Sequence, residues 1–175
     1  MVIRYPKACV PDPEMIGPEC NTAFELGKSI EIGDISTAMI IIVSYGSVLP
    51  EAVKARDILL QRGIDTGIVN ARFAAPLDKR ISQYLNQGKK IITVEDHSCA
   101  CGFGSAVLES AAASHIPNAR IKDIRIIGIP KTLIKHSSRE QQFKQVGLNA
   151  EKIAAAARDM IEKSPLTSYE RSNVS

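Results

Sequence analysis

The fold of this chain is decided by two apolar stretches, Gly67-Ile-Val-Asn-Ala71 and Lys90-Ile-Ile-Thr-Val94. Both are rich in β-branched residues, as expected of buried strands. Each runs directly into a polar or glycine-containing turn, and each turn leads into a stretch that we predict to be helical. In an open α/β sheet, ligands collect at the carboxyl ends of the strands. We therefore look for function in the turns that follow these two stretches.

Strands alternate with helices along the rest of the chain. Ala38–Ser44 and Ile124–Ile129 are continuous aliphatic runs, typical of strands buried on both faces. Lys28–Ile32 alternates polar and apolar residues, and Gly33-Asp34 supplies a turn before the next strand. We therefore predict an α/β fold in three layers, α/β/α, whose mostly parallel sheet has an antiparallel hairpin at one edge.

Helix boundaries are marked by residues with known end preferences. Gly63 and Gly88 follow two of the predicted helices and are expected to end them in a left-handed conformation. Ser138, followed three residues later by Gln141, predicts a capping box. The prolines between Lys7 and Cys20 predict an extended, irregular segment.

The composition excludes several classes of partner. The formal net charge is only +3, and Lys and Arg are scattered, so we expect neither nucleic acid nor a membrane surface as a partner. No apolar run approaches the roughly 20 residues of a membrane span. Four cysteines are too sparse for a disulfide scaffold, which favours a reduced, cytoplasmic setting.

Two motifs lie in the turn after Val94. Cys99-Ala-Cys101, two residues after His97, could hold a metal ion, but the chain offers no second ligand pair at zinc-site spacing. Gly102-Phe-Gly-Ser could bind phosphate at a helix start, but it lacks the Walker A lysine and the three-glycine spacing. The alternative is that these glycines permit a tight turn and close helix–sheet packing.

Arg72 stands one residue after a predicted strand and so points to the expected ligand crevice. Arginine is well suited to bidentate recognition of phosphate. The alternative is a structural ion pair with Asp78 or another carboxylate. Arg4 raises the same question with less context, and no complete catalytic set stands out anywhere in the chain.

Several blocks, in order, resemble the C-terminal part of the 1-deoxy-D-xylulose-5-phosphate synthase family. They are Ile3-Arg-Tyr-Pro-Lys, Val69-Asn-Ala-Arg-Phe, Pro76-Leu-Asp, Thr93-Val-Glu-Asp, Gly102-Phe-Gly-Ser-Ala-Val-Leu-Glu, Ile127-Gly-Ile-Pro and Gly147-Leu-Asn-Ala-Glu-Lys-Ile. The resemblance implies a transketolase C-terminal domain over residues 26–163. It also implies that residues 1–25 are the end of a preceding pyrimidine-binding domain plus a linker, and we expect residues 164–175 to form a flexible tail.

The resemblance also implies an activity. Such enzymes join pyruvate and glyceraldehyde 3-phosphate, with loss of CO₂, into 1-deoxyxylulose 5-phosphate, using thiamine diphosphate and Mg²⁺. Arg4 and Arg72 match two family arginines that hold the sugar-phosphate group. The implied partners are the N-terminal and middle domains of the same enzyme and a second copy in a homodimer.

No Gly-Asp-Gly…Asn motif for diphosphate and Mg²⁺ occurs in the sequence. We therefore expect this chain alone neither to bind thiamine diphosphate nor to turn over substrate. Two alternatives differ in class. The chain could be a stand-alone, non-catalytic subunit of a split transketolase-like enzyme, or the C-terminal domain of a 2-oxoacid dehydrogenase E1 β chain.

Overall fold

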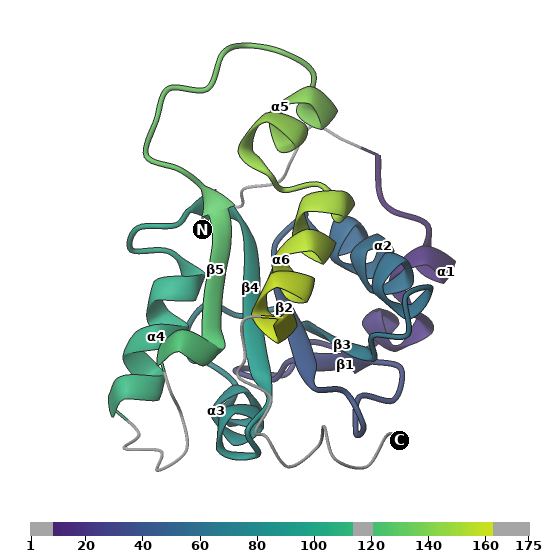
Figure 1. Ribbon diagram of the computed structural model, residues 1–175, viewed down its shortest axis with the longest axis vertical. Coiled ribbons are helices and arrows are strands. Elements are labelled where there is room, and N and C mark those ends of the chain that lie inside the picture. Colours follow the sequence, from purple (N-terminus) through teal and green to yellow (C-terminus); the bar gives the residue numbers. More distant parts are fainter. Residues whose placement is uncertain (1–8, 114–120, 163–175) are drawn as a thin grey trace, which may run out of the picture.

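The computed structural model describes residues 9–113 and 121–162, and Figure 1 shows their arrangement. The helices and strands follow one another in the order α1 (Pro13–Ile16), η1 (Pro18–Asn21), β1 (Ile30–Ile32), β2 (Ile40–Tyr45), α2 (Leu49–Leu60), β3 (Thr66–Asn70), α3 (Lys79–Asn86), β4 (Lys90–Ser98), α4 (Phe103–Ala113), η2 (Ile121–Asp123), β5 (Ile124–Ile129), α5 (Arg139–Val146) and α6 (Ala150–Glu162). None of the helices in these ranges is long and apolar enough to cross a membrane.

The five strands form one sheet in the order β1-β3-β2-β4-β5. β3, β2, β4 and β5 run parallel to one another, whereas β1 is antiparallel to β3. The α/β class and the antiparallel edge strand are therefore confirmed. The predicted hairpin is wrong in its pairing, because both sides of β2 are taken by the parallel strands β3 and β4. β1 consequently adds to the free edge of β3.

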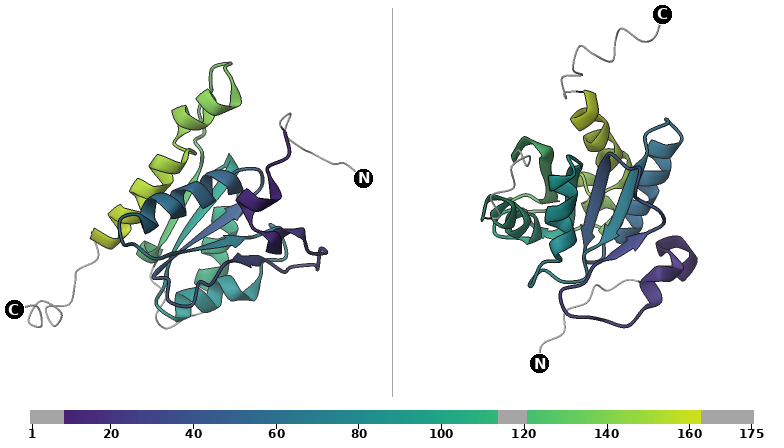
Figure 2. Two further views of the ribbon diagram at one scale, coloured as in Figure 1. Left: turned by 90° about the vertical axis from the view of Figure 1, so that its right-hand side faces the viewer. Right: turned by 90° about the horizontal axis from the view of Figure 1, so that it is seen from below.

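Helices cover both faces of this sheet (Figure 2). Alternation along β2 sends Ile40 and Ile42 to one face, where they join a core completed by α2 and α6. Ile41 and Val43 point to the other face, where α3 and α4 complete a second core. The continuous aliphatic run in β2 is thus explained by burial on both sides, as the sequence predicts.

The segment before the sheet differs from the extended, irregular chain predicted there. It contains the short helices α1 and η1, and a proline occupies the first turn of each. The Asp12 side chain accepts a hydrogen bond of 3.0 Å from the Glu14 backbone N–H and so caps α1. Proline is unfavourable inside a helix but is tolerated in its first turn. Short helices can therefore form in this segment despite its proline content.

The predicted helix boundaries are confirmed where their end signals are strongest. Gly63 and Gly88 have φ angles of 73° and 79°, in the left-handed region expected after a helix end. Ser138 and Gln141 form both hydrogen bonds of the capping box at the start of α5. Figure 1 places α5 beyond the carboxyl ends of the strands.

Candidate functional site

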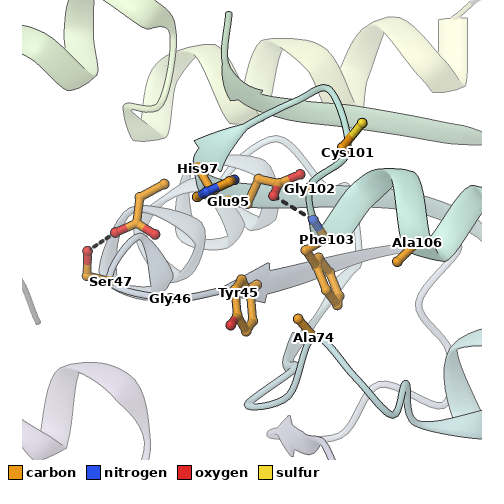
Figure 3. Close-up of a pocket in the computed structure, with 11 residues that line it drawn as sticks. Tyr45, Gly46, Ser47, Ala74, Glu95, His97, Cys101, Gly102, Phe103 and Ala106 are labelled. Atoms are coloured by element: carbon orange, nitrogen blue, oxygen red, sulfur yellow. Dashed lines mark hydrogen bonds between the residues drawn. The ribbon is translucent and has the colours of Figure 1, made fainter. Parts of the chain in front are cut away.

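The chain reverses direction in the sheet between β2 and β4. From β2 it proceeds through α2 to β3 on one side, and from β3 it crosses through α3 to β4 on the other side. The carboxyl ends of β2 and β4 therefore flank a topological switch point, where ligands bind in folds of this class. A cavity of about 670 Å³ lies there, lined by Tyr45, Gly46, Ser47, Ala74, Glu95, Asp96, His97, Cys101, Gly102, Phe103 and Ala106 (Figure 3). We call this cavity the switch-point crevice.

Glu95 is the most buried charged side chain of the crevice, with 0% of its surface exposed. Its carboxylate accepts hydrogen bonds from the backbone N–H groups of Phe103, at 2.7 Å, and Gly104, at 2.9 Å. These donors belong to the first turn of α4, where a negative charge is stabilised by the helix dipole. The protein's own carboxylate thus occupies the helix start that the Gly102-Phe-Gly-Ser motif offered to phosphate.

The glycines of that motif serve close packing, as the alternative interpretation predicted. A Cβ atom on Gly102 would collide with the Glu95 carboxylate and with the backbone oxygen of Ser98. A Cβ atom on Gly104 would lie 2.5 Å from Thr93 Oγ1. Gly102 therefore makes room for the carboxylate, and Gly104 lets α4 pack closely against the sheet.

Asp96 connects the crevice to α5. The Ser47 hydroxyl donates a hydrogen bond to Asp96, and Arg139 donates to the Ser47 hydroxyl, at 2.6 Å, and to the Ser47 backbone oxygen, at 3.1 Å. The Arg139 guanidinium also stacks on Phe143, 4.1 Å from the ring centroid. This chain of contacts fixes the turn after β2 against the start of α5.

The histidine and the two cysteines of the candidate metal motif, His97, Cys99 and Cys101, differ in accessibility. His97 and Cys101 are exposed, whereas Cys99 is partly buried. Burial raises the pKa of the Cys99 thiol, and the nearby Glu95 carboxylate raises it further. Within residues 9–113 and 121–162, no three His, Cys, Asp or Glu side chains gather closely enough to hold a metal ion.

Arg72 lies two residues after the end of β3, close to its predicted position, but it does not line the switch-point crevice. Its backbone has a φ angle of 57°, in the left-handed region that few residues other than glycine adopt. Its guanidinium donates to the backbone oxygens of Thr22, at 2.6 Å, and Ala23, at 3.1 Å. The guanidinium also stacks on Phe24, with 3.9 Å from Cζ to the ring centroid.

The suggested ion pair between Arg72 and Asp78 is not formed. Asp78 is 7% exposed and instead accepts hydrogen bonds from Arg80 and from both the backbone N–H and the hydroxyl of Ser29. Burial alone would raise the pKa of Asp78, but the hydrogen bonds from Arg80 and Ser29 outweigh it and lower the pKa to about 2. Asp78 therefore fixes the edge strand β1 to the start of α3.

A second hollow, of about 820 Å³, contains Arg72. Four basic and two acidic side chains line it, namely Lys28, Arg72, Lys79 and Arg80, and Glu25 and Asp78. Because Asp78 is already compensated by Arg80, the remaining charge of the lining favours an anion. We call this the Arg72 hollow.

Sequence reasoning placed Arg72 correctly after its strand but missed its surroundings. Thr22, Ala23 and Phe24 lie about 50 positions earlier, and no periodicity or motif connects them to Arg72. Asp78 did carry a local signal, since an aspartate directly before a helix is a preferred N-cap. Arg4 lies outside the described residues, as do residues 164–175.

Comparison with known proteins gives a consistent result. Residues 35–153 match the family described as "Transketolase, C-terminal domain". Similar curated proteins include three that are named 1-deoxy-D-xylulose-5-phosphate synthase. The protein of Synechococcus sp. (strain JA-3-3Ab) is 36% identical to this chain over 167 residues. That of Aquifex aeolicus (strain VF5) is 35% identical over 165 residues. That of Desulforudis audaxviator (strain MP104C) is 32% identical over 164 residues.

These alignments cover 93%, 91% and 90% of this chain, but only 24% of each relative. The chain thus spans about a quarter of the length of the curated relatives that it matches. Solved structures of transketolases share its fold. A split-gene transketolase described as an inactive β4 tetramer has a TM-score of 0.69 at 22% identity, covering 81% of this chain and 45% of that one. A transketolase mutant from Pichia stipitis has a TM-score of 0.58 at 20% identity, covering 81% and 19%.

Proposed function

This chain belongs to the family of transketolase C-terminal domains, and from this we propose that it is the C-terminal domain of a 1-deoxy-D-xylulose-5-phosphate synthase-type transferase. The observation that carries the proposal is the 36% identity to such a synthase along 93% of this chain. The reaction would join pyruvate and glyceraldehyde 3-phosphate, with loss of CO₂, into 1-deoxyxylulose 5-phosphate.

In this proposal the chain positions substrate and does not itself perform the chemistry. The thiamine diphosphate and Mg²⁺ would be held by the other three quarters of the enzyme, whether on the same polypeptide or on a partner chain. The cofactor, when bound there, supplies the carbanion chemistry of the reaction. Contacts with those parts and with a second copy of the enzyme would complete the assembly. The four free cysteines agree with a cytoplasmic setting.

The proposed contribution of this chain is to bind the phosphate of the substrate through Arg72 and Arg4. Three observations support Arg72. It follows a strand of the parallel sheet, it lines a hollow whose charge favours an anion, and it forms no salt bridge with a carboxylate of the described residues. A phosphate held far from the reacting carbonyl provides binding energy that orients the carbonyl.

Arg72→Ala in the assembled enzyme tests this role. Loss of charge-assisted hydrogen bonds worth about 1.5–3 kcal/mol should lower kcat/KM for the phosphorylated acceptor roughly ten- to hundredfold. Activity toward the unphosphorylated acceptor, D-glyceraldehyde, should change far less. Arg62→Ala is the matched control, because Arg62 is exposed and precedes β3 at the opposite edge of the sheet. Equal losses with both acceptors would show that Arg72 is structural.

A further inference from the structure

Phe24 is an aromatic side chain that the hydrophobic core does not explain. It is 75% exposed, and it belongs to neither of the two core clusters. Its ring nevertheless has two defined contacts. The Arg72 guanidinium lies over its face, and Phe73 meets it edge-on, with 6.0 Å between ring centroids and 87° between ring planes. The position of the ring is therefore tied to Arg72 and its neighbour.

The segment that carries Phe24 also holds the guanidinium through its backbone. One terminal nitrogen of Arg72 donates to the Thr22 backbone oxygen, and the other donates to the Ala23 backbone oxygen and, at 3.4 Å, to the Thr22 hydroxyl. A guanidinium has five N–H donors in one plane. Among the described residues, no hydrogen-bond acceptor meets the Nε–H, so this N–H remains available to an oxyanion.

The backbone of Arg72 is fixed as well. Its N–H donates to Asn70 Oδ1, at 3.3 Å, while its φ angle of 57° directs the side chain away from the path of an extended strand. A residue held in this sparsely populated conformation needs support from its surroundings. Thr22–Phe24 gives that support to the guanidinium, from a part of the chain 50 positions away.

We propose that Thr22–Phe24 positions the Arg72 guanidinium for phosphate, with Phe24 as the positioning residue. The inference rests on the proposed function of Arg72. The two backbone oxygens hold the terminal nitrogens, the ring fixes the plane, and the Nε–H donates to a phosphate oxygen. The ring is the contact to test by substitution, because the two shorter hydrogen bonds come from backbone oxygens.

Phe24→Leu tests the proposal, with Phe24→Tyr as the control that keeps an aromatic face. A cation–π contact at an exposed site corresponds to about a two- to fivefold change in the equilibrium constant between stacked and unstacked orientations. Apparent phosphate affinity falls by the same factor as the population of the competent orientation. In the assembled enzyme, Phe24→Leu should therefore raise KM for glyceraldehyde 3-phosphate by up to about fivefold, with kcat unchanged. KM for D-glyceraldehyde should stay constant, and Phe24→Tyr should behave as the unsubstituted enzyme.

A second measurement needs no catalysis. In the 175-residue chain, ring current from Phe24 should displace the Arg72 Nε–H resonance in a ¹H–¹⁵N NMR spectrum. Phe24→Leu should abolish this displacement, and Phe24→Tyr should retain it. An unchanged resonance in Phe24→Leu would overturn the positioning role.

The kinetic outcomes separate this inference from the function on which it rests. If Arg72→Ala selectively impairs the phosphorylated acceptor while Phe24→Leu leaves its KM unchanged, positioning by Phe24 is wrong and the role of Arg72 stands. If Arg72→Ala impairs both acceptors equally, the proposed function itself is wrong. If Phe24→Tyr loses as much as Phe24→Leu, the aromatic face is not what positions Arg72, and the inference is likewise overturned.

Discussion

Replacing Glu95 with glutamine should destabilise the fold, because its carboxylate accepts two hydrogen bonds at the start of α4. A glutamine amide has one acceptor oxygen and one donor nitrogen. Glu95→Gln can therefore satisfy only one of the two N–H groups, and it directs its own NH₂ at the other. Gly102 approaches the carboxylate closely, which leaves little room for the amide to rotate away.

The size of the effect follows from three contributions. Losing a hydrogen bond to a charged group costs about 1.5–3 kcal/mol, and losing the charge at a buried helix start costs up to about 2 kcal/mol. Burying a neutral amide in place of a carboxylate returns part of this, because the amide is less costly to desolvate. We expect a net loss of about 2–4 kcal/mol in the free energy of unfolding, against the 5–15 kcal/mol typical of single domains.

Urea denaturation of the 175-residue chain at pH 7, followed by circular dichroism, measures this free energy. Asp96→Asn is the matched control, since Asp96 is partly exposed and asparagine retains an acceptor for the Ser47 hydroxyl. The control should cost less than about 1 kcal/mol, as is usual for a site that keeps its hydrogen bond. An ordinary surface substitution changes the free energy of unfolding by roughly 0.5 kcal/mol or less. If Glu95→Gln changes it by no more than this, the carboxylate does not stabilise α4 and our reasoning fails.

Two further predictions concern titrating groups. The pKa of Asp78 is about 2 in the folded chain and higher in the unfolded chain. The Asp78 carboxylate therefore stabilises the fold above about pH 4, and this stabilisation is lost as the pH falls through 2. In urea titrations, Asp78→Asn should therefore lower the free energy of unfolding by about 2 kcal/mol more at pH 7 than at pH 2. The same loss at both pH values would contradict this. Iodoacetamide should alkylate the exposed Cys101 faster than Cys99, whose pKa is raised by burial and then by Glu95. Peptide mass spectrometry measures the alkylation rates of both thiols. As a control, the two rates should become equal when the chain is fully unfolded. Equal rates in the folded chain would show that Cys99 is not protected.

The sequence predicts those parts of the fold that depend on neighbouring residues. The aliphatic run in β2, the glycines after α2 and α3, and the capping box of α5 are all local signals, and each is confirmed. The pairing of β1 could not be predicted, because an alternating pattern identifies a half-buried strand without identifying its neighbour. That pairing depends on β3, whose residues come more than 30 positions later.

The same distinction applies to the candidate site. The position of Arg72 after a strand could be predicted, but its contacts with Thr22–Phe24 could not, because they join segments about 50 positions apart. Glu95 directly follows the predicted strand Lys90–Val94, but its role as a helix cap could not be predicted. That role depends on how the turn from Cys99 to Gly102 folds back, which brings the first N–H groups of α4 onto the carboxylate.

The use of Glu95 as a cap has a consequence for how this domain could recognise phosphate. A helix start at the carboxyl edge of a parallel sheet is the usual anion site in folds of this class. Here α4 already carries a buried carboxylate, and a phosphate beside it would face both an occupied set of donors and a like charge. Phosphate recognition therefore requires a side-chain cation away from α4. Arg72, which lines a separate hollow beyond β3, satisfies that requirement, and this is the physical reason for proposing phosphate there and not at the glycine-rich motif.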